Sequence, residues 1–269
     1  MRRILQLRRS VAAGLCWGDT VGETGFVEIL GLRVHKVDMA EAVRRVRDML
    51  VADDRAHQVV TLNSEMAMRA QCDRDLAFII NDADLVVPDG AGVVWASRVL
   101  GTPLPARVAG FDLMQELIAC AGAEGWPVFL LGAAPGVADE AAARLTVRVP
   151  GLRIAGIHHG FFGDRDEQGI VEKINASGAR LVFVAMGAPR QDRWIARNRA
   201  RLRPSVCIGV GGSLDVLAGR VSRAPKWMGE MGFEWLYRLV REPRRFVRML
   251  ALPKFMLRVF AEKFSRRNL

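Results

Sequence analysis

Six short runs of apolar and β-branched residues alternate with segments of helical periodicity, and this alternation limits the chain to few folds. The apolar runs cover residues 58–63, 84–89, 127–133, 152–160, 180–187 and 205–212. Apolar residues at helical spacing lie between them, at 66–81, 110–124, 137–149 and 190–201. Strands connected through helices form a mostly parallel sheet with both faces covered. We therefore expect an α/β fold with a Rossmann-like sheet and helices on both faces.

The positive charge of the chain is concentrated near its C-terminus. Residues 220–269 contain 13 Lys or Arg and 4 Asp or Glu, so they carry +9 of the net charge of +10. Aromatic and aliphatic residues recur there at helical spacing, which predicts a basic amphipathic helical appendage that associates with an anionic membrane surface. The alternative is a C-terminal helix packed on the core with a solvated basic face. We divide the chain into a basic N-terminal arm (1–24), an α/β domain (25–219) and this appendage (220–269).

Several classes of protein are disfavoured by the composition. No apolar run reaches the roughly 18 to 20 residues that a membrane-spanning helix needs. The four cysteines lie far apart, without a C-x-x-C pair, so neither a disulfide framework nor a zinc site is expected and a reducing cytosol fits best. The N-terminal arm resembles a secretory signal only weakly, because its apolar run is short.

Polar and glycine-rich segments follow five of the predicted strands. They are 61–65 (TLNSE), 88–90 (PDG), 132–136 (GAAPG), 187–192 (GAPRQD) and 209–215 (GVGGSLD). Ligands of parallel sheets bind beyond the carboxyl ends of the strands, and glycine-rich turns that lead into helices bind phosphate through backbone N–H groups. We infer a site for a nucleotide or a nucleotide sugar. The G-x-G-x-x-G and G-x-x-x-x-G-K-[ST] fingerprints do not occur, which disfavours a dehydrogenase or an NTPase.

A collinear series of motifs resembles the WecG/TagA/CpsF family of bacterial glycosyltransferases. The series runs through TLNSE, PDGAGVVWASRVLG, RVAGFDL, FLLGAAPG, MGAPRQDRWI and GVGGSLDVLAGRVSRAPKWMGEMGFEWLYRLVREPRR, and it covers roughly Gly25 to Arg248. Two positions depart from the family pattern. Asp192 stands where the family usually has Glu and reaches less far, and Phe111 fills a position that is often small.

The resemblance implies an inverting transfer of a sugar from a UDP-sugar to a polyprenyl-diphosphate-linked saccharide, in the synthesis of teichoic acid, common antigen or exopolysaccharide. It also implies a cytoplasmic enzyme, peripheral on the inner face of the plasma membrane. By family likeness Asp89 is the general base that takes the proton of the acceptor hydroxyl. A carboxylate held by a rigid turn at a strand end suits that role. The alternative is that Asp89 caps the helix that begins near Gly92.

The remaining candidate residues follow from the same strand ends and from the family motifs. Thr61 and Gln191 are assigned to catalysis with Asp89. Residues expected to bind substrate are Asn63, Arg107, Gly132, Gly187, Gly209, Asp215, Arg238, Arg245 and Arg248, of which the last three match C-terminal arginines that complete the site in the family. Thr61, Asn63, Gln191 and Asp215 could each instead be turn or cap residues.

We expect no metal and no other cofactor. Asp82-Ala-Asp84 matches the letters of a D-x-D metal motif, but it precedes its strand and therefore lies at the wrong end of the sheet. Arginine side chains, which pair bidentately with phosphate, are expected to neutralise the leaving UDP instead. His158 and His159 are expected to be structural.

Two other functions remain as alternatives at this point. A nucleotide-dependent metabolic enzyme such as a dehydrogenase would use the same sheet, and a nucleic-acid-binding protein would explain the basic tail. The polar and glycine-rich segments that follow five of the predicted strands favour the transferase. We expect its partners to be a UDP-sugar, a lipid-linked acceptor and a membrane surface, and we expect no nucleic acid. The sequence does not identify the donor, which could be UDP-N-acetylmannosamine, its uronic acid or UDP-glucose. It also leaves open the acceptor sugar and the oligomeric state, for which a homo-oligomer is one possibility.

Overall fold

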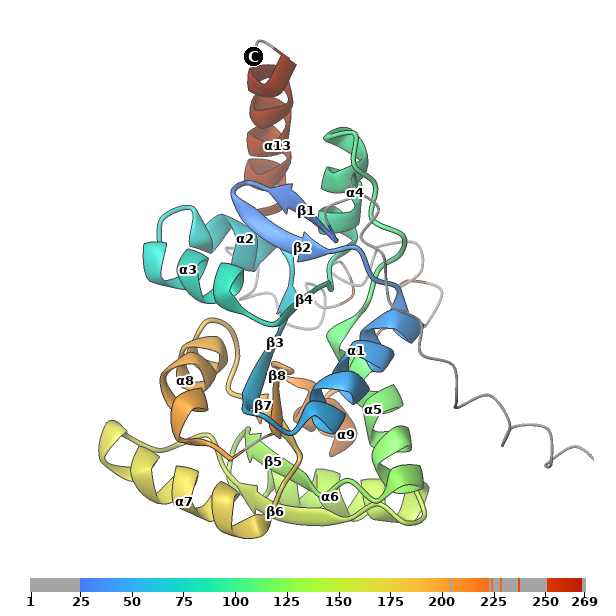
Figure 1. The fold of residues 1–269 in the computed structure, drawn as a ribbon, viewed down its shortest axis with the longest axis vertical. Helices are drawn as coiled ribbons and strands as arrows, with labels where there is room; N and C mark the ends of the chain where they lie inside the picture. The colour runs from blue at the N-terminus through green and yellow to red at the C-terminus, as the bar shows by residue number, and fades with distance from the viewer. Residues whose placement is uncertain are drawn as a thin grey trace, which may run out of the picture.

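A six-stranded parallel sheet forms the centre of the computed structural model, which describes residues 25–203, 205–222, 224, 228, 237 and 251–267 (Figure 1). Its strands are β3 (Ala56–Leu62), β4 (Leu85–Pro88), β5 (Val128–Gly132), β6 (Ile154–His158), β7 (Leu181–Ala185) and β8 (Ser205–Gly209). Their order in the sheet is β4-β3-β8-β7-β5-β6, and every neighbouring pair is parallel. All six predicted strands are present, so the predicted α/β fold is confirmed.

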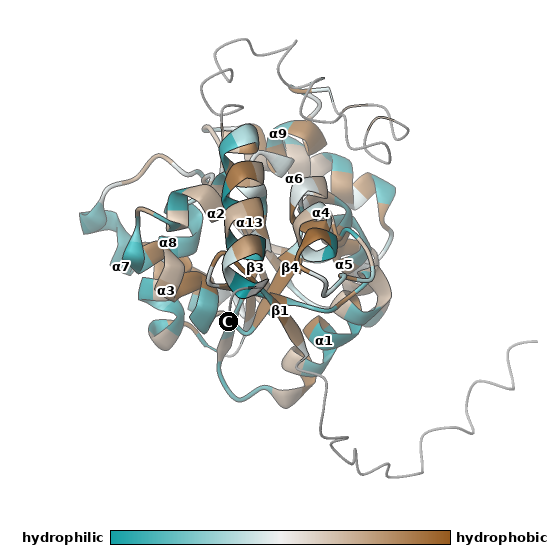
Figure 2. Cartoon of the chain, turned by 90° about the horizontal axis from the view of Figure 1, so that it is seen from above, coloured by the Kyte–Doolittle hydropathy of each residue, from teal (hydrophilic) through white to brown (hydrophobic). Residues whose placement is uncertain are grey.

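Helices cover both faces of this sheet, because alternate residues of each buried strand point to opposite sides. On β7, Leu181 and Phe183 join a core with α1 (Met39–Ala52), α5 (Gly110–Glu124), α6 (Val137–Arg148) and α9 (Ser213–Leu217). Val182 and Val184 join the opposite core with α7 (Glu167–Ser177) and α8 (Arg190–Asn198). Short 3₁₀ turns occupy Asp164–Asp166 and Arg199–Arg201. Figure 2 shows hydrophobic colouring on the central strands and mixed colouring on the helices around them.

The segment after β3 contains two helices where the sequence predicts one helix over 66–81. These are α2 (Ser64–Ala70) and α3 (Arg74–Asp82). The break comes at Asp73, whose carboxylate accepts a hydrogen bond from the backbone N–H of Leu76 at 3.0 Å and so starts a new helix. Asn63 caps α2 in the same way, accepting from the N–H of Met66 at 2.9 Å. Helix α2 therefore begins directly at the end of β3.

A two-stranded antiparallel hairpin, β1 (Phe26–Ile29) and β2 (Leu32–His35), packs against the sheet and was not predicted. Its turn residues, Leu30 and Gly31, both have positive φ, 52° and 75°. The inward side chains of the hairpin share a hydrophobic core with α2, α3 and α4 (Ala91–Val99). The hairpin thus extends the helical layer over β3 and β4.

The predicted C-terminal helix is present as α13 (Ala251–Arg267), which projects at one end of the molecule beside β1 and α4 (Figure 1). Phe255 and Val259 are fully buried in the core that contains α2 and α4. Glu262 accepts a hydrogen bond from the N–H of Leu30 at 3.0 Å, and Arg266 donates to the carbonyl of Glu28 at 3.1 Å. Helix α13 is therefore attached to the α/β domain, while the N-terminal arm 1–24 lies outside the described residues.

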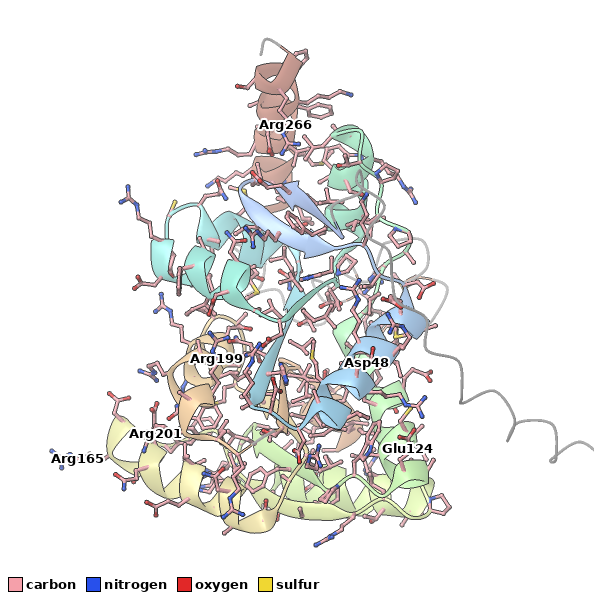
Figure 3. The ribbon with its side chains drawn as sticks, in the orientation of Figure 1. Asp48, Glu124, Arg165, Arg199, Arg201 and Arg266 are labelled. Atoms are coloured by element: carbon pink, nitrogen blue, oxygen red, sulfur yellow. The ribbon has the colours of Figure 1, made fainter. Side chains whose placement is uncertain are left out.

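Charged side chains gather on the outside of the described part of the chain. Figure 3 labels six of the charged side chains: Asp48, Glu124, Arg165, Arg199, Arg201 and Arg266. Several form ion pairs, including Arg47 with Glu124, Arg199 with Asp82 and Arg266 with Glu262. None of the helices in the described ranges has the length and hydropathy that crossing a membrane requires.

Candidate active site

A cleft of about 550 Å³ opens at the carboxyl ends of β3, β4, β7 and β8. Since the carboxyl ends of parallel strands meet at one edge of a sheet, residues far apart in the sequence come together here. Seven of the predicted site residues line it: Thr61, Asn63, Asp89, Arg107, Gly187, Gln191 and Asp215. Phe111, one of the two departures from the family pattern, lines it as well.

Asp89 is held rigidly at the end of β4. Its backbone N–H donates to the carbonyl of Leu62 at 2.9 Å, and its Oδ1 accepts from the N–H of Gly110, the first residue of α5, at 3.0 Å. The N-cap of α4 is Gly90, which provides no side-chain cap, so the alternative that Asp89 caps α4 is wrong. The carboxylate instead faces the partially positive N-terminus of α5, which stabilises a negative charge.

The segment from Arg107 to Gly110 runs alongside Asp89. Arg107 donates from Nε to the carbonyl of Asp89 at 2.7 Å, and the N–H of Val108 donates to the carbonyl of Pro88 at 2.9 Å. A Cβ on Gly110 would lie 2.9 Å from Cγ2 of Thr61, so only glycine lets α5 approach β3 this closely. These contacts fix a guanidinium and a carboxylate in the same part of the cleft.

Thr61 and Gln191 meet around the end of β8. The hydroxyl of Thr61 donates to the carbonyl of Gly209 at 3.0 Å, and Oε1 of Gln191 accepts from the N–H of Gly211 at 2.9 Å. A Cβ on Gly209 would lie 2.5 Å from Nε2 of Gln191. Gly209 therefore makes room for the Gln191 side chain and is not among the described residues that line the cleft.

Gly132 lies at the end of β5, outside the described lining of the cleft. Its φ is +129°, and a Cβ there would lie 2.4 Å from the carbonyl oxygen of Ala185 on β7. Close contact between two strands thus accounts for this glycine. Gly187, by contrast, lines the cleft with φ of +76°. Arg238, Arg245 and Arg248 lie outside the described residues.

Two charged residues of the lining, Glu65 and Arg69, were not among the predicted site residues. Both belong to α2, four positions apart, and therefore lie on one face of that helix. The signal in the sequence is the capping residue Asn63: a helix starting at Ser64 brings both side chains beside the end of β3. A helix predicted to start only at residue 66 did not reveal this.

Asp192, the other departure from the family pattern, points away from the cleft into the protein. The residue is 1% exposed, and neither carboxylate oxygen has a hydrogen-bond partner among the described residues. The backbone of Gly209 lies against it, since a Cβ on that glycine would be 3.2 Å from Oδ1 of Asp192. Burial raises the pKa of the Asp192 carboxyl to about 7, since the charged form loses its hydration.

The acids of the D-x-D sequence lie at the other end of the sheet, as predicted. Asp84 precedes β4, where its Oδ2 accepts from the N–H of Gln58 at 2.8 Å and its Oδ1 lies 3.2 Å from Nδ1 of His57. Within the part of the chain that the structure describes, no group of three or more His, Cys, Asp or Glu side chains could hold a metal ion. His158 and His159 lie at the end of β6 with ring centroids 4.7 Å apart, and line a separate hollow.

Comparison with known proteins agrees with the motif series. Residues 27–269 match the model of the "Glycosyl transferase WecG/TagA/CpsF family". A Bacillus subtilis strain 168 protein named N-acetylglucosaminyldiphosphoundecaprenol N-acetyl-beta-D-mannosaminyltransferase is 36% identical over 210 residues, which are 78% of this chain and 81% of that protein. Proteins of the same name from Bacillus spizizenii and from Staphylococcus aureus strain MW2 are 39% and 34% identical, over 75% and 89% of this chain and 77% and 94% of their own lengths. The chain belongs to the WecG/TagA/CpsF family of glycosyl transferases.

Proposed function

We propose that this glycosyl transferase moves a sugar from a UDP-sugar to a polyprenyl-diphosphate-linked saccharide, with inversion at the anomeric carbon and without a metal. The names of the relatives make N-acetylmannosamine the first candidate for the transferred sugar and N-acetylglucosamine-diphosphoundecaprenol the first candidate for the acceptor. The observation that carries the proposal is the fixed carboxylate of Asp89 in a cleft shared with Arg107 and Gln191. Family membership supersedes the dehydrogenase and nucleic-acid alternatives.

The reaction is a single displacement. A hydroxyl of the acceptor attacks the anomeric carbon of the donor, the bond from that carbon to the UDP oxygen breaks, and the hydroxyl proton passes to Asp89. The hydrogen bond from Gly110 to Oδ1 orients the carboxylate for this transfer. Arg107 positions the base through its hydrogen bond to the Asp89 carbonyl and adds positive charge to the cleft. Gln191, fixed through its Oε1, lines the cleft and contacts the substrates there.

A donor panel tests this function. Purified full-length protein is incubated with UDP-N-acetylmannosamine, its uronic acid or UDP-glucose, an acceptor of N-acetylglucosamine linked to polyprenyl diphosphate, and anionic vesicles, with and without EDTA. We expect transfer from one donor, undiminished by EDTA, with the product anomer opposite to that of the donor by NMR. Retention of configuration would contradict the single displacement, loss of activity with EDTA would contradict the metal-free reaction, and no transfer from any donor would contradict the proposed function.

We also propose that the enzyme works at a membrane in cell-surface polysaccharide synthesis, with α13 contacting the lipid. The face of α13 opposite its buried residues is apolar: Leu257 is 70% exposed and Phe264 is 61% exposed, and they are seven positions apart. Two turns of a helix separate such residues, so both point the same way. Lys254 and Arg258 flank this face and suit an anionic headgroup layer.

Vesicle flotation checks the membrane contact. We expect the double variant Leu257→Gln/Phe264→Gln to bind anionic vesicles at least tenfold more weakly than the unchanged protein, since each side chain loses roughly 1.5 to 3 kcal/mol of burial when fully inserted. The matched control is Val51→Gln/Phe78→Gln, which removes two other exposed apolar side chains, 82% and 68% exposed, on α1 and α3. Equal binding by the two double variants would exclude α13 as the contact.

A further inference from the structure

Arg69 is a cation of the cleft with no assigned role. It lies in the last turn of α2, is exposed, and lines the same cleft as Asp89. Within the described ranges its guanidinium has no hydrogen-bond or ion-pair partner, whereas Arg193 on the neighbouring α8 pairs with Asp73 at 2.5 Å. Arg107, the other described cation of the lining, already donates to the backbone beside Asp89. Arg69 is therefore available to an anion that enters the cleft.

The order of the strands separates the cleft into two sides. Asp89 and α2 follow β4 and β3, which lie together at one edge of the sheet. The glycine-rich turns that contain Gly187 and Gly211 follow β7 and β8, on the other side of β3. Because the general base must touch the acceptor hydroxyl, the acceptor occupies the side of β4 and β3, and the nucleotide occupies the side of the glycine-rich turns. Arg69 thus lies on the acceptor side.

Helix α2 also connects the cleft to α13. The two helices pack on each other through the core that contains Met66, Phe255 and Val259. A lipid-linked acceptor has its parts in a fixed order: the sugar hydroxyl, then the diphosphate one ring away, then the lipid. Asp89 and Arg69 line the same cleft, and α2, which carries Arg69, packs against α13. The diphosphate is the part of the acceptor that would meet Arg69.

We propose that Arg69 binds the diphosphate of the lipid-linked acceptor and gives the enzyme its preference for diphosphate-linked over monophosphate-linked acceptors. This inference rests on the proposed function. The planar guanidinium can donate two parallel hydrogen bonds to phosphate oxygens, a geometry that the ammonium of lysine does not reproduce. Glu65, on the same helix face, has an acceptor-only carboxylate that suits sugar hydroxyls and not phosphate.

Steady-state kinetics on full-length Arg69→Gln test the proposal. We expect the KM for a polyprenyl-diphosphate acceptor to rise at least tenfold, because the variant loses the charged hydrogen bonds to the phosphate oxygens, while the KM for the UDP-sugar stays within about threefold. The acceptor KM of Arg69→Lys should lie between that of Arg69→Gln and that of the unchanged enzyme. Arg98→Gln is the matched control, because Arg98 is an exposed arginine in the last turn of α4 and is not in the cleft lining.

Acceptor analogues give a second, independent readout. The unchanged enzyme should prefer the diphosphate-linked acceptor to the monophosphate-linked one by at least tenfold in kcat/KM, and Arg69→Gln should lose most of that preference. The proposal would be overturned if Arg69→Gln raised the KM for the donor and not for the acceptor, or if it left the acceptor KM as it is. It would also be overturned if the unsubstituted enzyme did not prefer the diphosphate-linked acceptor. Failure of the unchanged enzyme to transfer from any donor would instead overturn the proposed function itself. Thermal melting of each variant shows that it is folded.

Discussion

Asp89→Asn is expected to lower kcat by about 10² to 10⁴, the range that positioned proton transfer contributes. The amide oxygen of Asn can still accept from the N–H of Gly110, so the turn at the end of β4 keeps its geometry. What the variant loses is the carboxylate that we propose takes the acceptor proton. The KM of the UDP-sugar should change little, because we propose that the donor binds on the side of the glycine-rich turns. Initial rates at saturating donor and acceptor give the measurement.

Asp139→Asn serves as the control for this substitution. Asp139 is an exposed acid in the first turn of α6 and is not in the cleft lining, so its replacement tests the loss of a carboxylate near a helix N-terminus without touching the site. We expect it to leave kcat unchanged. If Asp89→Asn also left kcat unchanged, Asp89 would be a structural anchor of α5, and the proton would pass to another group.

The sequence predicted much of this site because of one property of parallel sheets. Thr61, Asp89 and Gln191 are far apart in the chain, and each lies at or near the end of an apolar run, while their roles came from the resemblance to the family. Once the runs are parallel strands, their carboxyl ends share one edge, and the residues there meet. The prediction needed neither exact strand ends nor the strand order.

The sequence did not predict which of the glycines line the cleft. Gly187 lines the cleft, but Gly132 and Gly209 are required by contacts with Ala185 and Gln191 inside the protein. A turn that needs glycine for close packing and a turn that needs glycine to bind phosphate have the same sequence, because a close neighbour and a bound phosphate both exclude a Cβ. Only the packing of β5 against β7, and of α8 against β8, distinguishes them.

The predicted ends of the helices were also inaccurate. The single helix predicted over 66–81 missed the cap at Asn63 and the break at Asp73. It therefore also missed the face of α2 that carries Glu65 and Arg69. Side-chain direction in α8 was equally hidden. Gln191 faces the cleft and its neighbour Asp192 faces the core, and a shift of one residue along a helix turns a side chain by about 100°. Apolar periodicity does not locate two adjacent polar residues that accurately.

Asp192→Asn should change how the stability of the protein depends on pH. Burial raises the pKa of the Asp192 carboxyl to about 7 in the folded protein, whereas an unfolded chain has an ordinary Asp pKa of about 3.9. Between these values the folded state holds a proton that the unfolded state has released, so the free energy of unfolding falls as pH rises. At about 1.4 kcal/mol per pH unit, the loss is on the order of 4 kcal/mol by pH 7. Asn resembles the protonated acid and does not titrate.

Urea unfolding from pH 2 to pH 8 measures this effect as a difference between Asp192→Asn and the unchanged protein. We expect the variant to gain relative stability steadily from about pH 4 to about pH 7 and then to stay level, because other titrating groups cancel in the difference. Glu41→Gln is the control of opposite sign. Hydrogen bonds from Arg44 lower the pKa of Glu41 to about 2, so that variant should lose relative stability as pH rises from about 2 to about 4.5, by a smaller amount because this pair is largely exposed to solvent. A difference curve for Asp192→Asn that is flat from pH 4 to pH 8 would mean that the buried carboxyl keeps its charge through contacts with water, and that its burial beneath Gly209 costs the fold nothing.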